Sequence, residues 1–384
     1  MRQVIRNGRV VLEDRIAEGM GVVLDGPAIE AILPNAQLPT DGAVLDAAGC
    51  FVAPGFIDVH VHGGGGCSFF DATPQAIETA CRTHLRHGTT TLLATLETAE
   101  EARMLAAIRA LVAFARSHEL GAMIGGINLE GPFLSESKAG AQARACLRPP
   151  DVELMERFLD AGEGLVKIVT LAPELPGADK VIRFLAKQGV VVAVGHSAAT
   201  AEETAEGIEC GIRLATHLYN AMSGLDHREP GVVGAVLDDE RVWCELICDG
   251  VHVAPVAARL AFKLKGLEHL VLVTDAIACL DGPREMTLFG ETVVVEDGAA
   301  RLPDGRLAGS VLTMERAVRY ASEIIGIGLP GAVRMATRTP AALIGQETRI
   351  GRLDYPGARA NLVFFGDDGS VVRTMLDGAT VFEA

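Results

Sequence analysis

The stretch TPQAIETACRTHLRHGTTTLLATL, residues 73–96, decides the fold class of this chain. It opens with Thr73 as a helix cap and Pro74 in the first helical turn, and after Gly88 it changes to a β-branched, apolar run. A strand that is apolar throughout, without alternation, is typical of a parallel sheet covered on both faces. The stretch therefore predicts one helix-strand unit of a parallel α/β fold.

The same succession of helix and strand recurs from Thr73 to about Gly345. Further pairs of a helix-like and a strand-like segment lie at 100–118 and 122–130, 152–162 and 165–173, 179–189 and 190–196, 200–211 and 212–220, and 256–266 and 269–276. A last pair of helices is predicted over 313–345. So many successive units favour a (β/α)8 TIM-like barrel over an open doubly wound sheet.

The two ends of the chain have a different pattern. Short β-rich pieces with turn signals such as Asn7-Gly8 fill the first 50 or so residues, and the tail after Gly351 contains further strand-like runs. We expect a small β-sandwich domain built from both termini, residues 1–52 and 350–384, and a barrel domain over 53–349. A β-hairpin insertion in a barrel loop is expected near 285–304.

Composition and charge exclude several classes of protein. The formal charge of −16 argues against nucleic acid as a partner, because a phosphate backbone requires a basic surface. No apolar run reaches about 18 residues, so no membrane span is predicted. The first residues lack the basic and apolar regions of a secretion signal, and the eight cysteines show no disulfide spacing. We therefore expect a cytoplasmic protein with reduced thiols and a small-molecule partner.

Polar side chains of metal-binding type stand at the ends of several predicted strands. They are His60, His62, Glu130, His196, His217 and Asp275. A lone strand histidine is more often a core or rim residue, but six such groups at the same end of their strands converge at the mouth of a barrel. Residues two apart in a strand face the same side, so His60 and His62 point at one centre. Imidazole and carboxylate ligands suit Zn²⁺ or another divalent metal, which predicts a hydrolytic site.

The order of the motifs adds a resemblance to a known family. PGFIDVHVHGGGG, LEGPF, VGHS, THLYNAM, REPG, DGVHV, LVTDA and LAGS follow one another between Pro54 and Ser310. In this order they resemble the N-acetylglucosamine-6-phosphate deacetylases of the amidohydrolase superfamily. The resemblance implies a hydrolase that removes the N-acetyl group from N-acetylglucosamine 6-phosphate by attack of a metal-bound hydroxide, giving glucosamine 6-phosphate and acetate.

The resemblance also implies roles for the residues at the strand ends. Glu130, His196 and His217 are expected to bind the main catalytic metal, a divalent ion with Zn²⁺ as the first choice. Because His60 and His62 are both present, a second metal is expected, with Glu130 bridging and Asp275 shared. The number of metals per subunit, one or two, stays open. Asp275 is expected to be the general acid/base of the reaction.

A second set of residues is implied to bind the substrate. The set comprises Gln142, Asn220, the backbone of Ala221, Arg228, His252 and Leu307. Arg228 and His252 would meet the phosphate, because a guanidinium matches phosphate oxygens with two parallel hydrogen bonds. Arg228 is expected to reach the site of a neighbouring subunit, which implies a homodimer. Leu307 would lie near the sugar.

Simpler interpretations exist for two of these residues. Asp275 could cap the start of a helix, and Arg228 could form a surface ion pair with Glu229 or Asp226. A cyclic amidohydrolase of the dihydroorotase type is disfavoured, because no lysine stands where a bridging carbamate would be needed and that strand ends in Glu130.

Gln142 departs from the family pattern. Family members usually read KxGAH after LEGPF, whereas this chain reads KAGAQ. Glutamine donates a hydrogen bond but brings no positive charge to a developing oxyanion. Three interpretations follow: a second metal polarises the carbonyl instead, the substrate is another N-acyl amino-sugar phosphate such as N-acetylgalactosamine 6-phosphate, or the protein binds a sugar phosphate with weak catalysis.

Overall fold

The computed structural model describes residues 2–288 and 290–384. The chain divides into two compact units. One comprises the residues up to Asp58 together with Arg82–Thr91 and Thr313–Ala384, and the other comprises Val59–Cys81 and Leu92–Leu312. The candidate site lies within the second unit.

An eight-stranded sheet forms the barrel. Its strands, in sheet order, are β17 (Leu270–Val273), β16 (Trp243–Ile247), β15 (Ile212–Ala215), β14 (Val191–Val194), β13 (Val166–Leu171), β12 (Ile124–Glu130), β11 (Thr89–Glu97) and β8 (Phe56–Val61). The pairs from β11 to β17 are parallel. A parallel bridge between Val61 and Ala276 joins the two edges of the sheet, so the ring of strands is nearly closed. The predicted TIM-like barrel is confirmed.

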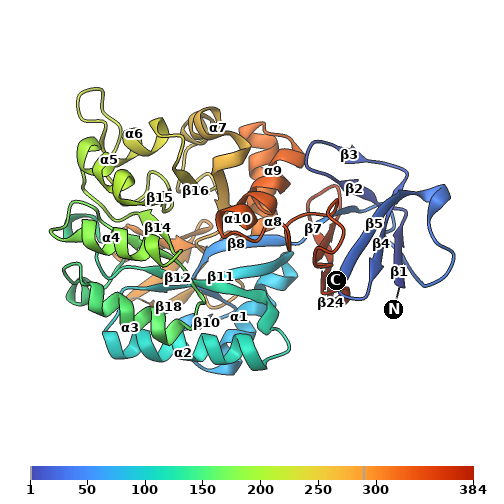
Figure 1. The fold of residues 1–384 in the computed structure, drawn as a ribbon, viewed down its shortest axis with the longest axis horizontal. Helices are drawn as coiled ribbons and strands as arrows, with labels where there is room; N and C mark the ends of the chain where they lie inside the picture. The colour runs from blue at the N-terminus through green and yellow to red at the C-terminus, as the bar shows by residue number, and fades with distance from the viewer. Residues whose placement is uncertain (1, 289) are drawn as a thin grey trace. The chain divides into compact units, whose positions relative to one another are not determined.

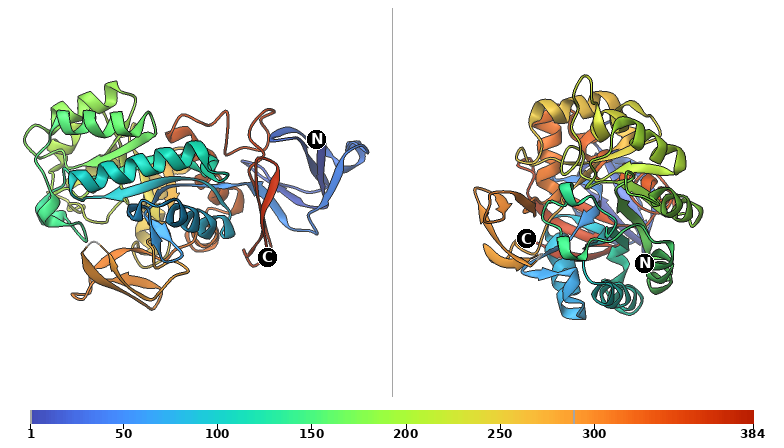
Figure 2. Two further views of the ribbon diagram at one scale, coloured as in Figure 1. Left: turned by 90° about the horizontal axis from the view of Figure 1, so that it is seen from below. Right: turned by 90° about the vertical axis from the view of Figure 1, so that its left-hand side faces the viewer.

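Helices alternate with these strands. They are α1 (Pro74–Arg86), α2 (Glu101–Ser117), α3 (Val152–Gly162), α4 (Ala178–Lys187), α5 (Ala201–Cys210), α6 (Gly231–Asp238) and α7 (Pro255–His269). In Figures 1 and 2, α2 to α7 lie outside the strands. The reason is visible in α4, where Ala178, Val181, Ile182 and Leu185 form one buried face at helical spacing. Short 3₁₀ turns lie at Asn35–Gln37, Phe69–Asp71, Gly121–Met123, Glu136–Lys138 and Arg144–Cys146.

Two further sheets, in the first unit, form a β-sandwich from both ends of the chain. One sheet contains β5 (Ala28–Pro34), β4 (Met20–Asp25), β1 (Arg2–Arg6) and β6 (Ala43–Asp46). The other contains β24 (Ala379–Glu383), β23 (Val371–Leu376), β22 (Leu362–Phe365), β7 (Phe51–Pro54), β2 (Arg9–Val11) and β3 (Ile16–Ala17). Ile5 and Leu24 of the first sheet share a buried core with Phe364 and Met375 of the second. The apolar faces of both sheets are buried in this way.

The predicted domain boundaries, 1–52 with 350–384 and 53–349, stay a prediction. The compact unit that holds the sandwich also contains α8 (Met314–Tyr320), a π-helical turn (Ala321–Ile325), α9 (Leu329–Met335) and α10 (Arg338–Leu343). Within residues 2–288 and 290–384, none of the helices has the length and apolarity that crossing a bilayer requires.

The insertion after β17 is larger than the hairpin expected near 285–304. It is an antiparallel sheet of β18 (Glu285–Leu288), β19 (Glu291–Glu296), β20 (Ala299–Arg301) and β21 (Leu307–Ser310). A second turn, around Gly305, adds strand β21 to the hairpin. Val293, Ala300 and Ala308 thereby share one buried apolar core with Ile277. Figure 2 shows this sheet, in orange, extending away from the ring of strands. A small pair, β9 (Gly63–Gly64) and β10 (Cys67–Ser68), follows β8.

Candidate active site

The six strand-end side chains predicted to bind metal come together in the structure. His60 lies in β8 and His62 directly follows it, Glu130 ends β12, and His196, His217 and Asp275 each come two residues after β14, β15 and β17. All six are buried. Because the strands are parallel, their carboxyl ends meet at one mouth of the barrel and deliver these groups to one point.

Three of these residues have a backbone conformation that L-amino acids rarely adopt. The φ angles are 46° at His196, 31° at His217 and 51° at Asp275. The left-handed region costs free energy for residues other than glycine, so it persists only where the surrounding structure imposes it. Gly309, in LAGS, allows the chain to pass close to Asp275, since a Cβ at that position would lie 3.0 Å from the Asp275 carbonyl oxygen.

Glu130, His196 and His217 form the first group of potential ligands. Glu130 Oε1 lies 2.9 Å from Nε2 of His196 and 2.9 Å from Nε2 of His217. The two Nε2 atoms are 3.2 Å apart. One ligand atom of each residue lies within 4.8 Å of the others, which is the spacing that a single cation needs.

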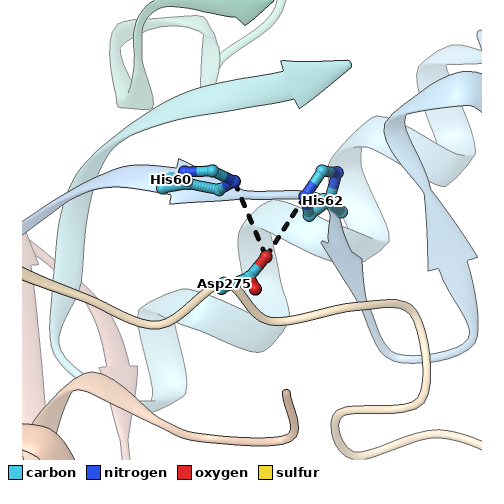
Figure 3. Close-up of side chains that lie close together, drawn as sticks. All are labelled: His60, His62 and Asp275. Carbon is cyan, nitrogen blue, oxygen red and sulfur yellow. Dashed lines mark ion pairs between the residues drawn. The ribbon is translucent and has the colours of Figure 1, made fainter. Parts of the chain in front are cut away.

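His60, His62 and Asp275 form the second group. Asp275 Oδ1 lies 3.2 Å from Nε2 of His62 and 3.6 Å from Nε2 of His60. Figure 3 shows both imidazole rings directed toward this carboxylate. Glu130 lies between the two groups, with Oε1 3.7 Å from His60 Nε2 and Oε2 3.5 Å from His62 Nε2.

Two glutamates that sequence reasoning missed hold the histidines in place. Glu245 Oε2, in β16, lies 2.9 Å from Nδ1 of His60 and accepts the backbone N–H of His217 at 3.0 Å. Glu97 Oε2, at the end of β11, lies 3.3 Å from Nδ1 of His62. These bonds direct Nε2 of each ring inward, because the carboxylate takes the other ring nitrogen.

The sequence contained signals for both glutamates. Glu97 ends the run TTTLLATLE, in the same position relative to its strand as Glu130. Glu245 interrupts the apolar strand WCELI and is fully buried there. A charged residue inside a buried strand requires a partner, and here that partner is an imidazole.

The charges of the cluster stabilise one another. Burial by itself lowers the pKa of His60, but the Glu245 carboxylate, together with two further carboxylates, outweighs burial and raises that pKa to about 9. Burial raises the pKa of Glu130, but the charge of His196 and hydrogen bonds from the imidazoles outweigh burial and hold the pKa well below its usual value. The carboxylates therefore favour positive charge at this point, which a divalent cation would supply.

The donor set fits a divalent metal. Four imidazoles and two carboxylates provide nitrogen and oxygen ligands, the combination that suits zinc and related divalent ions, and no thiolate contributes to either group of described residues. The outer carboxylates orient the imidazoles, as is usual for metal-binding histidines. The carboxylate of Asp275 bonds to His62 in this cluster, so it does not serve as a helix cap.

Gln142 contacts Glu130. Its Nε2 donates to Glu130 Oε2 at 2.7 Å, and its Oε1 accepts the backbone N–H of Thr98 at 2.7 Å. The orientation of the amide is determined, since a backbone N–H can only donate. Gln142 was predicted to bind substrate; it lines the pocket, but both ends of its amide are already engaged with protein groups.

A cavity of about 360 Å³ lies over the cluster. Its walls include His62, Glu130, His196, His217 and Asp275, the predicted substrate residues Gln142, Asn220, Ala221, His252 and Leu307, and the cations Lys138, Arg144 and Arg306. The backbone carbonyl of Lys138 lies 2.8 Å from Nδ1 of His196. Arg228 does not line this cavity within the single chain. It is exposed, and within the described residues its guanidinium forms no ion pair with Asp226 or Glu229.

One wall of the cavity has donors suited to an anion. Nδ1 of His252 is bound to Asp249 Oδ2 at 2.6 Å, so its Nε2 is the ring nitrogen that remains. Ala221 has a left-handed φ of 50°, and among the described residues its N–H donates to no backbone acceptor. Asn220 differs, because its Nδ2 already donates to the carbonyls of His217 and Leu218 at 3.2 Å. Asn220 therefore holds the turn that presents Ala221.

Residues 51–381 match the amidohydrolase family, and the chain belongs to this family. The family is metal-dependent, in agreement with the two groups of potential ligands at the strand ends. The resemblance seen in the motifs is thereby confirmed.

Within this family the chain is similar to amino-sugar phosphate deacetylases. It is 36% identical over 386 residues to the N-acetylglucosamine-6-phosphate deacetylase of Bacillus subtilis (strain 168), with 99% of this chain and 94% of that protein covered. It is 35% identical over 379 residues to the N-acetylgalactosamine-6-phosphate deacetylase of Escherichia coli O157:H7, with coverage of 98% and 99%. The crystal structure of N-acetylglucosamine-6-phosphate deacetylase from Pasteurella multocida superposes with a TM-score of 0.94, at 33% identity and 99% coverage of both chains.

Proposed function

We propose that this protein is a metal-dependent deacetylase that converts N-acetylglucosamine 6-phosphate to glucosamine 6-phosphate and acetate. The observation that carries the proposal is the position of Asp275, a carboxylate that lines the cavity while it contacts both histidines of the second ligand group. The relatives support the substrate class. N-acetylgalactosamine 6-phosphate is the second candidate, because one relative of equal coverage acts on that sugar.

The proposed cofactor is a divalent metal, with Zn²⁺ as the first choice. Glu130, His196 and His217 would hold one ion, and His60, His62 and Asp275 would hold a second. A cation held there supplies Lewis acidity, which makes water nucleophilic near neutral pH and polarises the amide carbonyl. The shared position of Glu130 between the groups supports two ions per subunit.

Asp275 is proposed to move the proton. Burial raises its pKa, but the hydrogen bond from His62 and the neighbouring imidazole charges outweigh burial and lower the pKa. The carboxylate is therefore ionised at neutral pH and can accept a proton from the attacking water. It then returns this proton to the amide nitrogen, so that the amine leaves uncharged.

The phosphate of the substrate is proposed to lie against Ala221 and His252. The N–H of Ala221 faces no other acceptor among the described residues and can donate to a phosphate oxygen. Nε2 of His252 can donate as well when the ring carries both protons, because Nδ1 then donates to Asp249. Leu307 would pack against the sugar. Arg228 would reach this phosphate from a second copy of the chain, since it lies outside the cavity of its own chain.

A homodimer is the proposed assembly. Val256, Leu260 and Leu264 form a stripe on α7 at four-residue spacing, and their exposed fractions are 62%, 51% and 61%. Leu225 and Val251, in two loops that precede α7 in the sequence, are exposed as well. A contiguous apolar stripe on a surface helix marks an interface.

All eight cysteines are free thiols, which supports action in the reducing cytoplasm.

The first test is acetate release from N-acetylglucosamine 6-phosphate by protein loaded with Zn²⁺. The substitution Asp275→Asn should lower kcat by roughly 10²- to 10⁴-fold, because it removes the proton acceptor and keeps the fold. The galactose isomer and unphosphorylated N-acetylglucosamine serve as comparison substrates. Folded, metal-loaded protein that releases no acetate from either phosphorylated sugar would refute the deacetylase proposal.

A further inference from the structure

Three cationic side chains line the cavity although the protein is strongly acidic. The chain carries a formal charge of −16, yet Lys138, Arg144 and Arg306 all line this one cavity. Cations around a concave opening with protein walls concentrate an anionic ligand there, because field lines are focused in the cleft. Neither Arg144 nor Arg306 belongs to the substrate-binding set implied by the sequence motifs.

Arg306 is held in a defined orientation. It follows the turn between β20 and β21 of the inserted sheet, where its backbone N–H donates to Asp304 Oδ1 at 3.0 Å. Its Nε donates to Asp304 Oδ2 at 2.6 Å, and its Nη1 contacts the carbonyl of Gly140. Nη2 is the nitrogen that remains for a ligand. A guanidinium fixed in this way loses little conformational entropy when it binds an oxyanion.

Arg144 lies in the 3₁₀ turn Arg144–Cys146 and is exposed. In the part of the chain that the structure describes, no carboxylate forms an ion pair with its guanidinium. A cation that lines a cavity and has no acidic neighbour is available for an anion. Arg144 comes two residues after Gln142, so it approaches the cavity from the segment that also contacts Glu130.

The position of Arg306 relates it to the wall proposed to bind phosphate. Its contact with the Gly140 carbonyl places the guanidinium beside Gly140. A Cβ built on Gly140 would lie 3.9 Å from Cβ of Ala221 and 3.3 Å from Cε1 of His196. Gly140 therefore separates Arg306 from Ala221 by about the width of one residue. The inserted sheet thus brings a guanidinium to the same wall as the free N–H of Ala221.

We propose that Arg144 and Arg306 form an anion-binding subsite that receives the phosphate of the amino sugar within a single chain. This inference rests on the proposed function for the identity of the sugar, and it adds two same-chain cations to a site for which only a cation from a second chain was expected. The subsite allows each chain to attract and orient a phosphorylated sugar by itself. Arg228 of a second copy would then strengthen phosphate binding without being its sole cationic partner.

Arg144→Ala, Arg306→Ala and the double variant test the subsite in the full-length, Zn²⁺-loaded protein. Arg284→Ala is the matched control, because Arg284 is an exposed arginine at the start of the same inserted sheet and does not line the cavity. Calorimetry measures the binding of glucosamine 6-phosphate and of glucosamine. Acetate release from N-acetylglucosamine 6-phosphate provides KM and kcat for each variant.

Each single variant is expected to weaken glucosamine 6-phosphate binding by roughly tenfold and the double variant by roughly 100-fold, the usual effect of losing charge-assisted hydrogen bonds. KM should rise in parallel while kcat stays within about threefold, because the subsite is proposed to bind the phosphate and not the amide. Glucosamine binding and the Arg284→Ala variant should be unchanged.

Variants that bind glucosamine 6-phosphate as the parent does, or that lose glucosamine to the same degree, would overturn the subsite. Parent protein that binds no glucosamine 6-phosphate would overturn it as well. Arginine-dependent binding without acetate release would support the subsite and refute the deacetylase. Acetate release with normal KM in the double variant would refute the subsite and leave the deacetylase intact.

Discussion

At the scale of single residues, Gln142 makes contacts that its sequence position did not predict. Its amide connects Glu130 to the backbone of Thr98 through two bonds of 2.7 Å. Glu130 belongs to the first ligand group and lies 3.7 Å and 3.5 Å from the two histidines of the second, so its orientation affects both groups. A neutral amide holds this carboxylate through a hydrogen bond and adds no positive charge. A protonated histidine at the same place would donate a hydrogen bond and add a positive charge.

Removal of the Gln142 amide should weaken metal binding. In Gln142→Ala both Glu130 Oε2 and the Thr98 N–H lose their partner, so we expect the affinity for Zn²⁺ to fall by roughly 10- to 100-fold. Competitive titration with a chromogenic chelator measures this affinity. Gln188→Ala, at an exposed glutamine after α4, is the control and should bind Zn²⁺ normally. Normal affinity in Gln142→Ala would show that Gln142 does not position Glu130.

Glu245 should affect the metal site through two contacts. It bonds Nδ1 of His60 and the backbone N–H of His217, so Glu245→Gln weakens the orientation of one ligand from each group. We expect a loss of about 10- to 100-fold in Zn²⁺ affinity, with the second ion lost first. Metal analysis of dialysed protein measures the stoichiometry. Glu240→Gln, at an exposed glutamate, is the control and should keep the metal stoichiometry of the parent protein. A Glu245→Gln variant that keeps the same stoichiometry would contradict this role of Glu245.

At the scale of elements, most strands of the barrel deliver a polar group to the site, and the helices that follow them turn an apolar face to the core. The apolar face of α4 illustrates the core side, and Glu130 at the end of β12 illustrates the site side. Helix α7 departs from this division, because it exposes Val256, Leu260 and Leu264 in one stripe. An exposed apolar stripe is unfavourable in water unless another surface covers it.

Leu260→Glu should therefore convert a dimer to a monomer. The substitution places a charge in the middle of the stripe, where burial in an interface would cost several kcal/mol. Sedimentation velocity measures the change in mass, and Lys263→Glu on the same helix is the control for added negative charge. If the parent protein is itself a monomer, or if Leu260→Glu remains a dimer, α7 is not the interface. Loss of the dimer should also raise KM for the phosphorylated sugar, because Arg228 is proposed to reach the phosphate from a second copy of the chain.

At the scale of the whole molecule, the buried cluster makes stability depend on metal. Four imidazoles and two carboxylates from five strands meet at one point, so a cation bound there joins segments distant in sequence. A ligand that binds only the folded state at a thousand times its Kd stabilises that state by about 4 kcal/mol. Bound metal should thus raise the temperature at which the barrel unfolds.

Chelation should lower the midpoint of thermal unfolding by roughly 10 °C, and restored Zn²⁺ should recover it. Differential scanning calorimetry measures the midpoint before and after dialysis against the chelator. A variant with His196→Ala and His217→Ala, which keeps the second ligand group, should show a smaller difference between the two conditions. Equal midpoints for the parent protein with and without metal would mean that the cluster does not bind it in the folded state.

The sequence by itself determined the barrel, the sandwich from both termini and the six strand-end side chains that meet at its mouth. These features follow from local patterns: apolar strands, helix caps, and polar residues immediately after a strand, which parallel strands bring to one edge. Only the tertiary structure decided which groups hold those ligands and which cations surround them. Glu97, Glu245, Gln142, Arg144 and Arg306 have no local pattern that predicts their partners. Their contacts join segments far apart in sequence, and such contacts exist only once the barrel and its inserted sheet have formed.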